Sequence, residues 1–380
     1  MGLRGFKSVV SRRAFLEKYL GIVLKNIGTH SLDESVVSTR NCENMIGVSQ
    51  IPLGISDSLK INGKKYYVPL ATTEGALVAS ISRGCKAISL SGGAAVVTVK
   101  AGATRGPVFR IKNLKERRII EDFLETNFGD MKKLVKKTGS HISLEKYSTK
   151  MVGHNFYIRF VFDTADAMGM NMVSVATQAI TDFIEKRIKI KCISLSGNFC
   201  VDKKASWQNF IQGRGFEVWA EVVIKKEILK NVLKTSAENF YNVWLAKCMM
   251  GSALGGSVGF NAQFANVVAA IFLATGQDPG HIVEGSLGIT STEIVGEDLY
   301  VSVYLPDIML GTVGGGTSLT TQKEALLILE KGRKGRGFHS EELAQVVGGA
   351  VLAGEISLLA SLSEGSLVRA HRRLGRGEKI

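Results

Sequence analysis

Apolar and polar positions alternate regularly through the middle of the chain. Short apolar runs there predict strands, and two segments whose apolar residues recur every three to four positions predict helices. The predicted order is strand, helix, strand, strand, helix, strand, at Pro107–Ile111, Leu114–Glu125, Ile142–Lys146, Phe156–Phe162, Met172–Ile184 and Ile190–Leu195. This order is typical of a ferredoxin-like module, and its length suits a small domain inserted into a larger one.

The sequence on either side of this module has longer apolar segments that are rich in glycine. Strands are predicted at Ala94–Lys100, Glu217–Val223 and Leu299–Leu305, and the segment Ser236–Thr275 is predicted to be mostly helical. Leu343–Leu362 predicts an apolar helix that packs in a core or against another subunit. We therefore expect an α+β fold with a large mixed domain of helices and sheet.

The changes in pattern set the expected domain boundaries. Residues 1–40 are expected to form a lead-in segment, and residues 106–193 an inserted ferredoxin-like domain. Residues 41–105 and 194–380 are expected to form the large domain. A chain of 380 residues forms two domains more often than one.

Charge and cysteine content narrow the classes of function. The net charge of +14 is spread over clusters such as Lys132–Lys137 and Lys186–Lys191, without interleaved aromatic residues. Such clusters indicate solvated faces or a site for a ligand with several phosphates, and they leave a non-catalytic basic binding protein as a rival. The five cysteines form no CxxC pair, which argues against a disulfide framework or a zinc site and fits a reducing compartment.

The sequence predicts neither a membrane span nor a secretory signal. No apolar run reaches the length of about 18 residues that a spanning helix requires, because Ala344–Leu362 is broken by Gln345, Glu355 and several glycines. The basic start before Glu17 is interpreted as a solvated surface, with an organellar transit peptide as the alternative. A cytoplasmic protein without a membrane partner is expected.

One carboxylate stands among small and apolar residues in the segment ATTEGALVAS, residues 71–80. Glutamate is almost never fully buried unless it is paired. Glu74 is therefore either a charge near the start of a helix that faces water or a carboxylate kept for chemistry. The composition of the segment leaves both readings open.

Short motifs occur in a fixed order over most of the chain. They are ENMIG (43–47), ATTEG (71–75), TRGPV (104–108), DAMGMNM (166–172), SGNFCVDKK (196–204), GRG (213–215), GQDP (276–279), GTVGGGT (311–317) and LVRAH (367–371). The set closely resembles the catalytic portion of the 3-hydroxy-3-methylglutaryl-coenzyme A (HMG-CoA) reductase family, in the biosynthetic class shared by eukaryotes and archaea. The resemblance implies reduction of HMG-CoA to mevalonate and free coenzyme A with two NADPH, the committed reductive step of the mevalonate pathway to isoprenoids.

The resemblance implies four catalytic residues. Lys203 matches the family's lysine, which stabilises the negative charge that develops on the thioester carbonyl oxygen. Glu74 matches the carboxylic acid that protonates the aldehyde from a half-apolar pocket, and Asp278 matches the aspartate that hydrogen-bonds to the lysine and the glutamate. His371 matches the histidine that protonates the coenzyme A thiolate.

The resemblance also implies binding residues and no metal ligands. The substrate residues are Arg105, Ser196, Asp202, Lys204, Lys247 and Asn266, with Ser80, Arg83 and the 43–47 motif near coenzyme A. The cofactor residues are Asp166, Met168, Gly169, Met170, Asn171, Val313, Gly314 and Gly315. Glycine lets the backbone of this dinucleotide loop approach the phosphates, and the helix that follows offers its N-terminal amides.

The chain departs from the family pattern at a few positions. Ser140 and His141 replace an Arg-Phe pair whose arginine is the expected partner of the 2′-phosphate of NADPH, so the choice between NADPH and NADH stays open. Gln263 replaces a histidine that is usual in the family, and Ile81 and Ser82 replace a Thr-Asn pair near the presumed coenzyme A contacts.

The expected assembly is a homodimer or tetramer, because the family's site forms between two subunits. Lys203 and Glu74 are then expected to come from different chains. The enzyme alternative is an NADH-linked or degradative-direction HMG-CoA reductase, and the non-enzyme alternative is the basic binding protein on the same fold. All four catalytic positions carry the residue types that the reaction requires, which argues against the non-catalytic binding protein. No nucleic-acid partner is expected.

Overall fold

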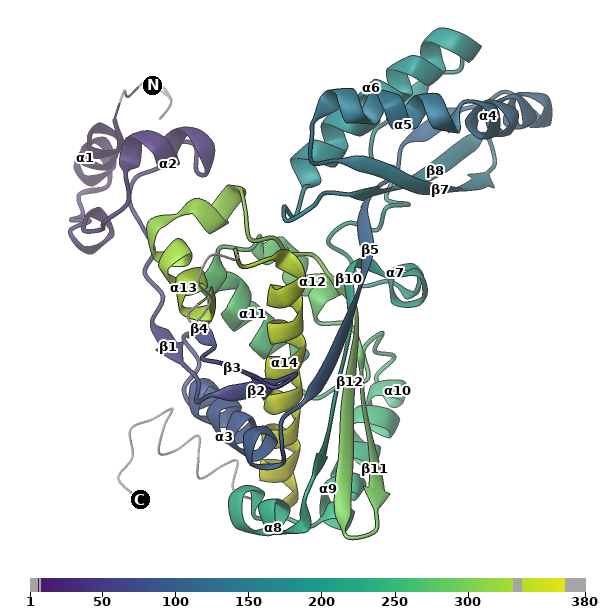
Figure 1. Cartoon of the computed structure of the whole chain (residues 1–380). Coiled ribbons are helices and arrows are strands. Elements are labelled where there is room, and N and C mark those ends of the chain that lie inside the picture. Colours follow the sequence, from purple (N-terminus) through teal and green to yellow (C-terminus); the bar gives the residue numbers. More distant parts are fainter. Residues whose placement is uncertain (1–5, 7, 331–336, 366–380) are drawn as a thin grey trace.

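The computed structural model describes residues 6, 8–330 and 337–365 and shows an α+β protein, as the sequence predicts (Figure 1). A large unit combines a sheet with apolar helices, and a small unit lies at one end of the long strand β5 (Ala95–Arg105). A helical segment from the N-terminal part of the chain lies beside the large unit. The site described below lies where the large and small units meet.

The small unit has the strand order β9-β6-β8-β7 with antiparallel pairing, which is the arrangement of a ferredoxin-like module. Its elements are β6 (Val108–Arg110), α4 (Leu114–Thr126), α5 (Phe128–Thr138), β7 (Ser143–Val152), β8 (Asn155–Asp163), α6 (Met170–Ile188) and β9 (Cys192–Ser194). The predicted strands and helices are confirmed, but α5 was not predicted. It follows α4 after the single residue Asn127, so the two helices fill the place of one expected helix.

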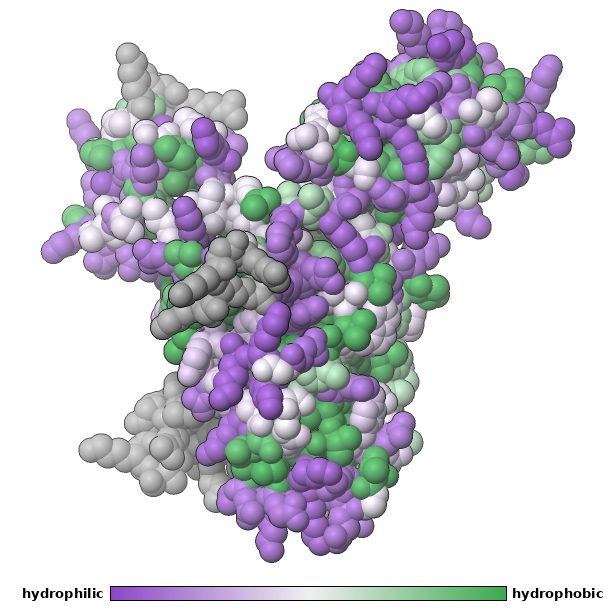
Figure 2. All heavy atoms as spheres, in the orientation of Figure 1, coloured by the Kyte–Doolittle hydropathy of each residue, from purple (hydrophilic) through white to green (hydrophobic). Residues whose placement is uncertain are grey.

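The helices of the small unit turn their charged residues toward water. The exposed residues of α5 include Lys132, Lys133, Lys136 and Lys137. Met131 and Val135, at helical spacing on the opposite face, are fully buried. Figure 2 shows a mostly hydrophilic surface over these helices. This basic cluster is therefore the solvated face of an amphipathic helix.

Strand β5 joins the two units because it changes partner along its length. Its first part pairs with β10 (Arg214–Ile224), from Ala95 opposite Glu221 to Gly102 opposite Gly215, and its last three residues pair with β8. Gly102 has φ 90°, and a Cβ there would lie 2.8 Å from the Phe162 carbonyl oxygen. Glycine is required where the strand crosses from one partner to the other.

The large unit packs its helices against the sheet β11-β12-β10-β5. Besides β5 and β10, its strands and long helices are β1 (Leu53–Ile55), β2 (Leu59–Ile61), β3 (Lys64–Tyr66), β4 (Pro69–Ala71), α3 (Leu77–Leu90), α9 (Ala237–Trp244), α11 (Phe264–Thr275), β11 (Ile289–Val295), β12 (Asp298–Ile308), α13 (Thr320–Glu330) and α14 (Ser340–Ser363). Short helical turns connect them, namely α7 (Trp207–Gln212), α8 (Lys226–Ile228), η3 (Leu229–Leu233), η4 (Leu245–Gly251), α10 (Ser252–Leu254), η5 (Pro279–His281), α12 (Ile282–Gly285) and η6 (Gly315–Ser318).

Helix α14 forms the centre of the large unit (Figure 1). It packs against α3, α11, β10 and β12. Among the described residues, α14 alone is long and apolar enough to cross a membrane by length and composition, contrary to the expectation that no segment would be, and 83% of its apolar window is buried inside the structure. Packing in a core accounts for its hydrophobicity, as the first of the two alternatives for this helix predicts.

The N-terminal segment packs onto the ENMIG motif. Its elements are α1 (Val9–Leu20), η2 (Asn26–Gly28) and α2 (Glu34–Arg40). The Nε of Arg12 donates to the Met45 carbonyl oxygen at 2.8 Å, and Nη1 of Arg13 donates to that of Ile46 at 3.0 Å. Arg12 is only 8% exposed. The reading of a solvated basic start is wrong for Arg12, because its buried guanidinium donates to the carbonyl oxygens of Met45 in the motif and of Phe6.

Candidate active site

Lys203 and Asp278, two of the predicted catalytic residues, form a close ion pair. The Lys203 ammonium lies 2.6 Å from Oδ2 of Asp278, and the other carboxylate oxygen accepts the Gly280 amide at 2.9 Å. Partial burial raises the pKa of Asp278, but the hydrogen bonds from Lys203 and from the Gly280 amide outweigh it and hold the pKa below its ordinary value. The ion pair therefore holds the Lys203 ammonium at a fixed position beside η5.

The loop that carries Lys203 has a strained backbone. Asn198, Val201 and Lys203 all have positive φ, at 63°, 49° and 55°. This conformation is rare for residues other than glycine, above all for a β-branched valine, and such strain concentrates at functional sites. Side chains from elsewhere hold the loop in place. Asn209 donates to the Val201 carbonyl oxygen at 2.9 Å, and Glu284 accepts the Lys203 amide at 3.2 Å.

A buried ion network lies behind this loop. Arg214 of β10 is fully buried and donates from Nη1 to Glu284 at 2.7 Å and from Nη2 to Asp202 at 2.6 Å. Burial lowers the pKa of Arg214, but the carboxylates of Asp307, Asp202 and Glu284 together raise it above its ordinary value. The guanidinium therefore stays charged and fixes Asp202, which lies one residue before Lys203.

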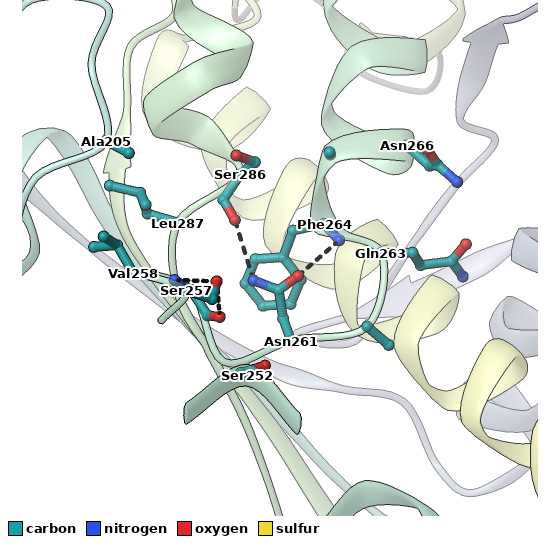
Figure 3. Close-up of a pocket in the computed structure, with 13 residues that line it drawn as sticks. Ala205, Ser252, Ser257, Val258, Asn261, Gln263, Phe264, Asn266, Ser286 and Leu287 are labelled. Carbon is teal, nitrogen blue, oxygen red and sulfur yellow. Dashed lines mark hydrogen bonds between the residues drawn. The ribbon is translucent and has the colours of Figure 1, made fainter. Parts of the chain in front are cut away.

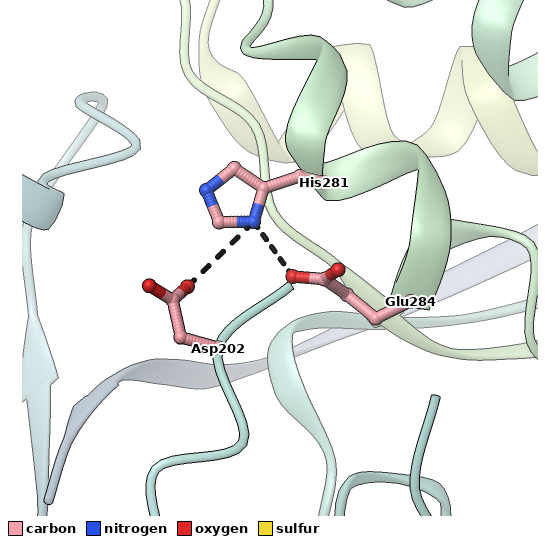
Figure 4. A group of neighbouring side chains, drawn as sticks. All are labelled: Asp202, His281 and Glu284. Carbon is pink, nitrogen blue, oxygen red and sulfur yellow. Dashed lines mark hydrogen bonds and ion pairs between the residues drawn. The ribbon is translucent and has the colours of Figure 1, made fainter. Parts of the chain in front are cut away.

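Asp202, His281 and Glu284 converge closely enough to hold a metal ion (Figure 4). Nδ1 of His281 lies 2.6 Å from Oε1 of Glu284 and 3.9 Å from Oδ1 of Asp202. These same two carboxylate oxygens already accept the guanidinium of Arg214. A second cation between them would face a buried positive charge, so Arg214 supplies the charge that a metal would otherwise supply.

The predicted substrate residues of the TRGPV and VDKK motifs gather around Asp202. Nη1 of Arg105 lies 3.8 Å from Oδ2 of Asp202, and Nη2 of Arg105 donates to Ser174 of α6. Ser196 and Lys204 are exposed on the same loop, and Lys204 Nζ donates to the carbonyl oxygen of Asp202 at 3.1 Å. The structure thus brings Arg105 at the end of β5 together with the 196–204 loop.

A pocket of about 410 Å³ opens next to this loop and reaches Ala205 (Figure 3). Asn261 shapes it by donating to the Ser286 carbonyl oxygen at 3.1 Å and accepting the Phe264 amide at 3.2 Å. Gln263 and Asn266 line the same pocket and are drawn together on one side of it in Figure 3. A pocket of this size suits part of a small-molecule substrate.

Lys247, another predicted substrate residue, is exposed within the π-helical segment η4. A π-helical turn is rare and is frequent at functional sites. The positive charge of Lys247 lowers the pKa of the fully buried Glu355 of α14, although burial raises that pKa by more. Lys247 is therefore close enough to act on the carboxylate of Glu355, which accepts the Ala262 and Gln263 amides in the loop before α11.

The DAMGMNM motif forms the turn into helix α6. Gly169 has φ 84° and stands at the N-cap of α6, where a Cβ would lie 2.4 Å from Thr164. No side chain of the described residues caps this helix, so its first amides have no capping partner there. The exposed Asn171 and the half-buried Met168 and Met170 surround this end. The open amides and the close backbone approach fit a phosphate group.

The second glycine motif lies beside this turn. Ala167 and Val313 form a parallel bridge, and the Thr312 amide donates to the Asp166 carbonyl oxygen at 2.8 Å. Gly314 and Gly315 are exposed, with open space where a Cβ would stand. The structure thus brings the predicted cofactor residues of both motifs together, with bare backbone facing outward.

We call the site between the DAMGMNM turn and the exposed glycines Gly314 and Gly315 the cofactor cradle. The carboxylate of Asp166 does not face this cradle. It accepts the Ser340 amide at 2.8 Å and the Ser340 hydroxyl at 3.0 Å, and its other oxygen lies 2.8 Å from Nδ1 of His339. Partial burial raises the pKa of Asp166, but the hydrogen bonds from His339 and Ser340 outweigh it and lower the pKa overall. Asp166 therefore anchors the start of α14, and only its backbone lines the predicted cofactor site.

Comparison with known proteins decides the family. A model of the family described as hydroxymethylglutaryl-coenzyme A reductase matches residues 8–376. The chain belongs to the HMG-CoA reductase family. The reductase of Methanocaldococcus jannaschii is 47% identical over 375 residues, which cover 96% of this chain and 92% of that protein. Reductase 3 of Hevea brasiliensis is 43% identical over 384 residues, which cover 98% of this chain and 65% of that protein.

A solved structure of the family shares the fold. The class II HMG-CoA reductase of Streptococcus pneumoniae, described as bound to NADPH in open conformations, aligns with a TM-score of 0.70 at 18% identity. The alignment covers 95% of this chain and 100% of that chain. The family membership that the motifs predict is therefore confirmed, and so is the mixed α+β fold.

Glu74 has a different setting from the one expected of the HMG-CoA reductase acid. It is exposed in the turn between β4 and α3, where its amide donates to Thr72 Oγ1 at 3.0 Å. Among the described residues, no hydrogen bond or ion pair joins its carboxylate to Lys203 or Asp278. The expected half-apolar pocket is thus not built around Glu74 by the described part of one chain.

Ser80 and Arg83, predicted near coenzyme A, hold α3 against α14. Ser80 lies 3.0 Å from the Ser357 hydroxyl, and Arg83 donates to the hydroxyl and the carbonyl oxygen of Ser357 and to Ser361. Desolvation lowers the pKa of Arg83. Both side chains are therefore already engaged within the protein.

The departures from the HMG-CoA reductase pattern have structural explanations in part. Ile81 of α3 is fully buried in the core of the large unit. The hydroxyl of Ser82 accepts the Asp57 amide at 3.1 Å. The side chain of Gln263 donates to the Gly354 carbonyl oxygen of α14 at 2.6 Å. Ser140 and His141 are exposed in the turn before β7.

The turn that contains Ser140 and His141 lies at the end of the small-unit sheet where strand β8 leads into the DAMGMNM loop. Ser143, at the start of β7, pairs with Asp163, the last residue of β8. Ser140 and His141 precede Ser143, and the loop to Gly169 follows Asp163. The predicted contact with the 2′-phosphate therefore falls next to the cofactor cradle. His371 lies outside the described residues.

Sequence reasoning missed the residues that support the site from behind. Arg214, His281, Glu284 and Asp307 are fully buried charged or titratable side chains, and Glu355 of α14 accepts the Ala262 and Gln263 amides at 2.8 and 2.7 Å. Two of these residues stand inside motifs or beside them: Arg214 in GRG and His281 two residues after GQDP. A signal was present, because charged residues inside apolar motifs are rarely without partners.

Proposed function

We propose that this chain reduces HMG-CoA to mevalonate and free coenzyme A, using NADPH, as the committed reductive step of isoprenoid biosynthesis. The observation that carries the proposal is the Lys203 ammonium, held 2.6 Å from Asp278 on a strained loop in a chain of the HMG-CoA reductase family. Thioester reduction builds negative charge on the carbonyl oxygen, and a fixed cation is the group that stabilises it.

The other catalytic roles follow from the same chemistry. We assign Glu74 the protonation of the aldehyde oxygen, since that oxygen needs a proton as the second hydride arrives. Asp278 holds the lysine in place through the ion pair described above. His371 protonates the thiolate of coenzyme A, which would otherwise attack the aldehyde again. Arg105, Asp202 and Lys204, which cluster beside Lys203, and Asn266 in the adjacent pocket bind the glutaryl portion.

The cofactor proposal rests on the cradle between the DAMGMNM and GTVGGGT motifs. Bound NADPH supplies the hydride for each step. The uncapped N-terminus of α6 and the bare backbone at Gly314 and Gly315 fit its phosphates. NADPH is the form that the Streptococcus reductase structure is described as holding. Ser140 stands where the family has an arginine partner for the 2′-phosphate, so NADH remains the alternative cofactor.

The proposal extends to assembly, domains and location. We propose a homodimer or larger oligomer with sites between subunits, because Glu74 is exposed in the single chain. We propose residues 106–193 as the dinucleotide-binding domain, and residues 41–105 with 194–380 as the substrate-binding and dimerisation domain. Residues 1–40 then support the ENMIG segment through Arg12 and Arg13. We propose a cytoplasmic enzyme.

The proposal is tested by one assay with a matched pair of variants. Purified protein is given HMG-CoA with NADPH or with NADH, and coenzyme oxidation is followed by absorbance. Lys203→Ala is expected to lower kcat by at least about 100-fold, because one preorganised partner of the oxyanion is lost. The control is Lys64→Ala, which removes an exposed lysine of β3 and should leave the rate unchanged.

Two outcomes would redirect the proposal. No oxidation of either coenzyme would contradict reductase activity and favour the basic binding protein. Faster turnover with NADH than with NADPH would favour the NADH-linked or degradative reading, since the arginine expected at position 140 is a serine here.

A further inference from the structure

The strained residue Val201 lies two positions before Lys203, and buried side chains hold the peptide groups on both sides of it. Oγ1 of Thr104 in β5 donates to the Cys200 carbonyl oxygen at 2.9 Å, and Nδ2 of Asn209 in α7 donates to the Val201 carbonyl oxygen at 2.9 Å. The side chains of Thr104 and Asn209 are fully buried. The first bond fixes the peptide group before Val201 and the second fixes the one after it, so together they determine its φ and ψ.

The hydrogen-bond partners of the Asn209 side chain allow its amide only one orientation. Arg159 has only donors to offer, and its Nη2 donates to Oδ1 of Asn209 at 3.3 Å. On the other side, Nδ2 of Asn209 donates to Oδ2 of Asp307 at 2.7 Å as well as to the Val201 carbonyl oxygen. Both N–H groups and the oxygen are therefore occupied. Any rotation of the amide would leave at least one buried partner unsatisfied, so the side chain is held rigidly.

Helix α7, which carries Asn209, is itself fixed to the sheet of the large unit. The side chain of Ser206 caps this helix by accepting the Asn209 amide at 3.2 Å. Phe210 packs against Tyr304 of β12 in an edge-to-face arrangement, with ring centroids 6.0 Å apart. Asp307, which accepts the Asn209 amide group, lies in the same strand. Asn209 is thus anchored through contacts outside the 196–204 loop.

The conformation of Val201 needs such support, because its φ of 49° is one that β-branched residues rarely adopt. If the bond to its carbonyl oxygen were lost, Val201 would turn toward an ordinary negative φ, and the residues after it would rotate with it. The Lys203 ammonium, held 2.6 Å from Asp278, would then be displaced. A displacement of about 1 Å in a reacting geometry can cost about 100-fold in rate.

We propose that Asn209 is a positioning residue, which holds Val201 in the left-handed conformation and thereby places the Lys203 ammonium for the reaction. The inference rests on the proposed function, because the position of Lys203 matters through the thioester reduction that it serves. Since Asn209 is fully buried, its effect passes through the backbone of residues 201–203.

The first test asks whether glycine at position 201 makes Asn209 dispensable. Glycine adopts positive φ without steric cost, so Val201→Gly removes the strain that Asn209 opposes. We expect Asn209→Ala to lower kcat for HMG-CoA reduction at least about 10-fold, while KM for NADPH changes less than about 2-fold, because other segments build the cofactor cradle. Val201→Gly alone, and Val201→Gly combined with Asn209→Ala, should both keep kcat within about 3-fold of the parent.

The matched control is Lys189→Gly in the Asn209→Ala background. Lys189 also has a positive φ, 60°, but it ends helix α6. This substitution should restore no activity. Rescue by Lys189→Gly would overturn the proposal, because it would reflect only a gain in overall stability. A loss of kcat that is the same with and without Val201→Gly, or no loss in Asn209→Ala, would also overturn it. If Asn209→Ala does not fold, Asn209→Ser takes its place in the same comparison, since it keeps a hydroxyl group at the buried position.

The second test measures the loop without using activity. Hydrogen exchange of the Lys203 amide, which donates to Glu284 at 3.2 Å, is compared in the parent and in Asn209→Ala. We expect exchange of this amide to be at least about 10-fold faster in the variant, because the loop opens locally. The amide of the buried Ala220 in β10 is the control and should exchange at the parent rate.

An unchanged rate at Lys203, or an equal acceleration at Ala220, would overturn the proposal. The first result would show that other contacts hold the loop, and the second would show that the variant is destabilised as a whole. A parent protein that reduces HMG-CoA with neither coenzyme would refute the proposed function instead. The exchange rates would then still decide whether Asn209 holds the loop.

Discussion

At the scale of single residues, this protein gives its carboxylates different environments for different purposes. Asp278 is part exposed and paired with Lys203, which holds its pKa low. Asp307 of β12 is fully buried, and burial raises its pKa to about 8 although the Arg214 charge opposes this. Glu355, fully buried in α14, also has a raised pKa because burial outweighs its three hydrogen bonds. The charged form is thus favoured for the carboxyl group of Asp278 and disfavoured for the buried carboxyl groups of Asp307 and Glu355.

The raised pKa of Asp307 predicts a pH dependence of stability. An unfolded aspartate has a pKa of about 3.9, so between about pH 4 and 8 the native state holds a proton that the unfolded state has lost. The free energy of unfolding therefore falls as the pH rises through this interval. Asp307→Asn cannot titrate and should show a smaller loss between pH 5 and pH 8, measured by urea denaturation.

The control for this prediction is Asp57→Asn, which removes an exposed carboxylate. It should keep the parent slope of stability against pH. An Asp307→Asn protein with the parent slope would show that Asp307 stays ionised throughout, stabilised by Arg214.

At the scale of elements, glycines of the core helices lie where neighbouring helices and strands approach most closely. A Cβ at Gly84 of α3 would lie 1.9 Å from the Ala353 carbonyl oxygen of α14. In α14, a Cβ at Gly348 would lie 2.4 Å from Val218 of β10, and one at Gly354 would lie 2.6 Å from Val267 of α11. Helix α14 therefore meets a different neighbour at each glycine, which explains why an apolar core helix keeps residues that weaken an isolated helix.

Gly84→Ala is expected to destabilise the protein by about 1–3 kcal/mol or more, because the methyl group meets backbone that cannot rotate away. Gly129→Ala in α5 is the matched substitution, since no atom of the described part of the chain lies within 4 Å of its Cβ position. That variant should be as stable as the parent or more so. The free energy of unfolding measures both. Equal stabilities would mean that α3 can shift away from α14 at little cost.

At the scale of the whole molecule, one chain carries the parts of the proposed site in separate places. Lys203 and Asp278 meet beside the 196–204 loop, while Glu74 is exposed between β4 and α3. An exposed carboxylate next to apolar residues of α3 suits a position that a second copy covers. A twofold dimer would use both surfaces twice and so build two sites.

Mixing two inactive variants tests this assembly. Lys203→Ala and Glu74→Gln homodimers should each be inactive. If the two residues come from different chains, dissociation and reassembly of an equal mixture yields mixed dimers with one intact site each. About a quarter of the parent activity is then expected, because half of the dimers are mixed and each has one of two sites. Activity that stays at the level of the separate variants would place both residues in one chain.

Much of the fold and the site follows from local sequence. The predicted elements of the small unit, except α5, lie where periodicity places them, and Lys203 and Asp278 meet as their motifs predict. Periodicity failed at α5 because one residue separates two helices with the same period. It also left α14 open between a core and a subunit contact, since apolar spacing does not say what covers a helix.

The amino-acid sequence by itself determined the family, the order of most elements and the residue types of the chemistry, because each is written in short local patterns. Only the tertiary structure decided what those residues face. It buries Arg12 against the ENMIG segment, turns Asp166 toward α14, leaves Glu74 in water and places His281 behind Asp278. These outcomes depend on segments far apart in the chain, and packing alone sets the distances between them.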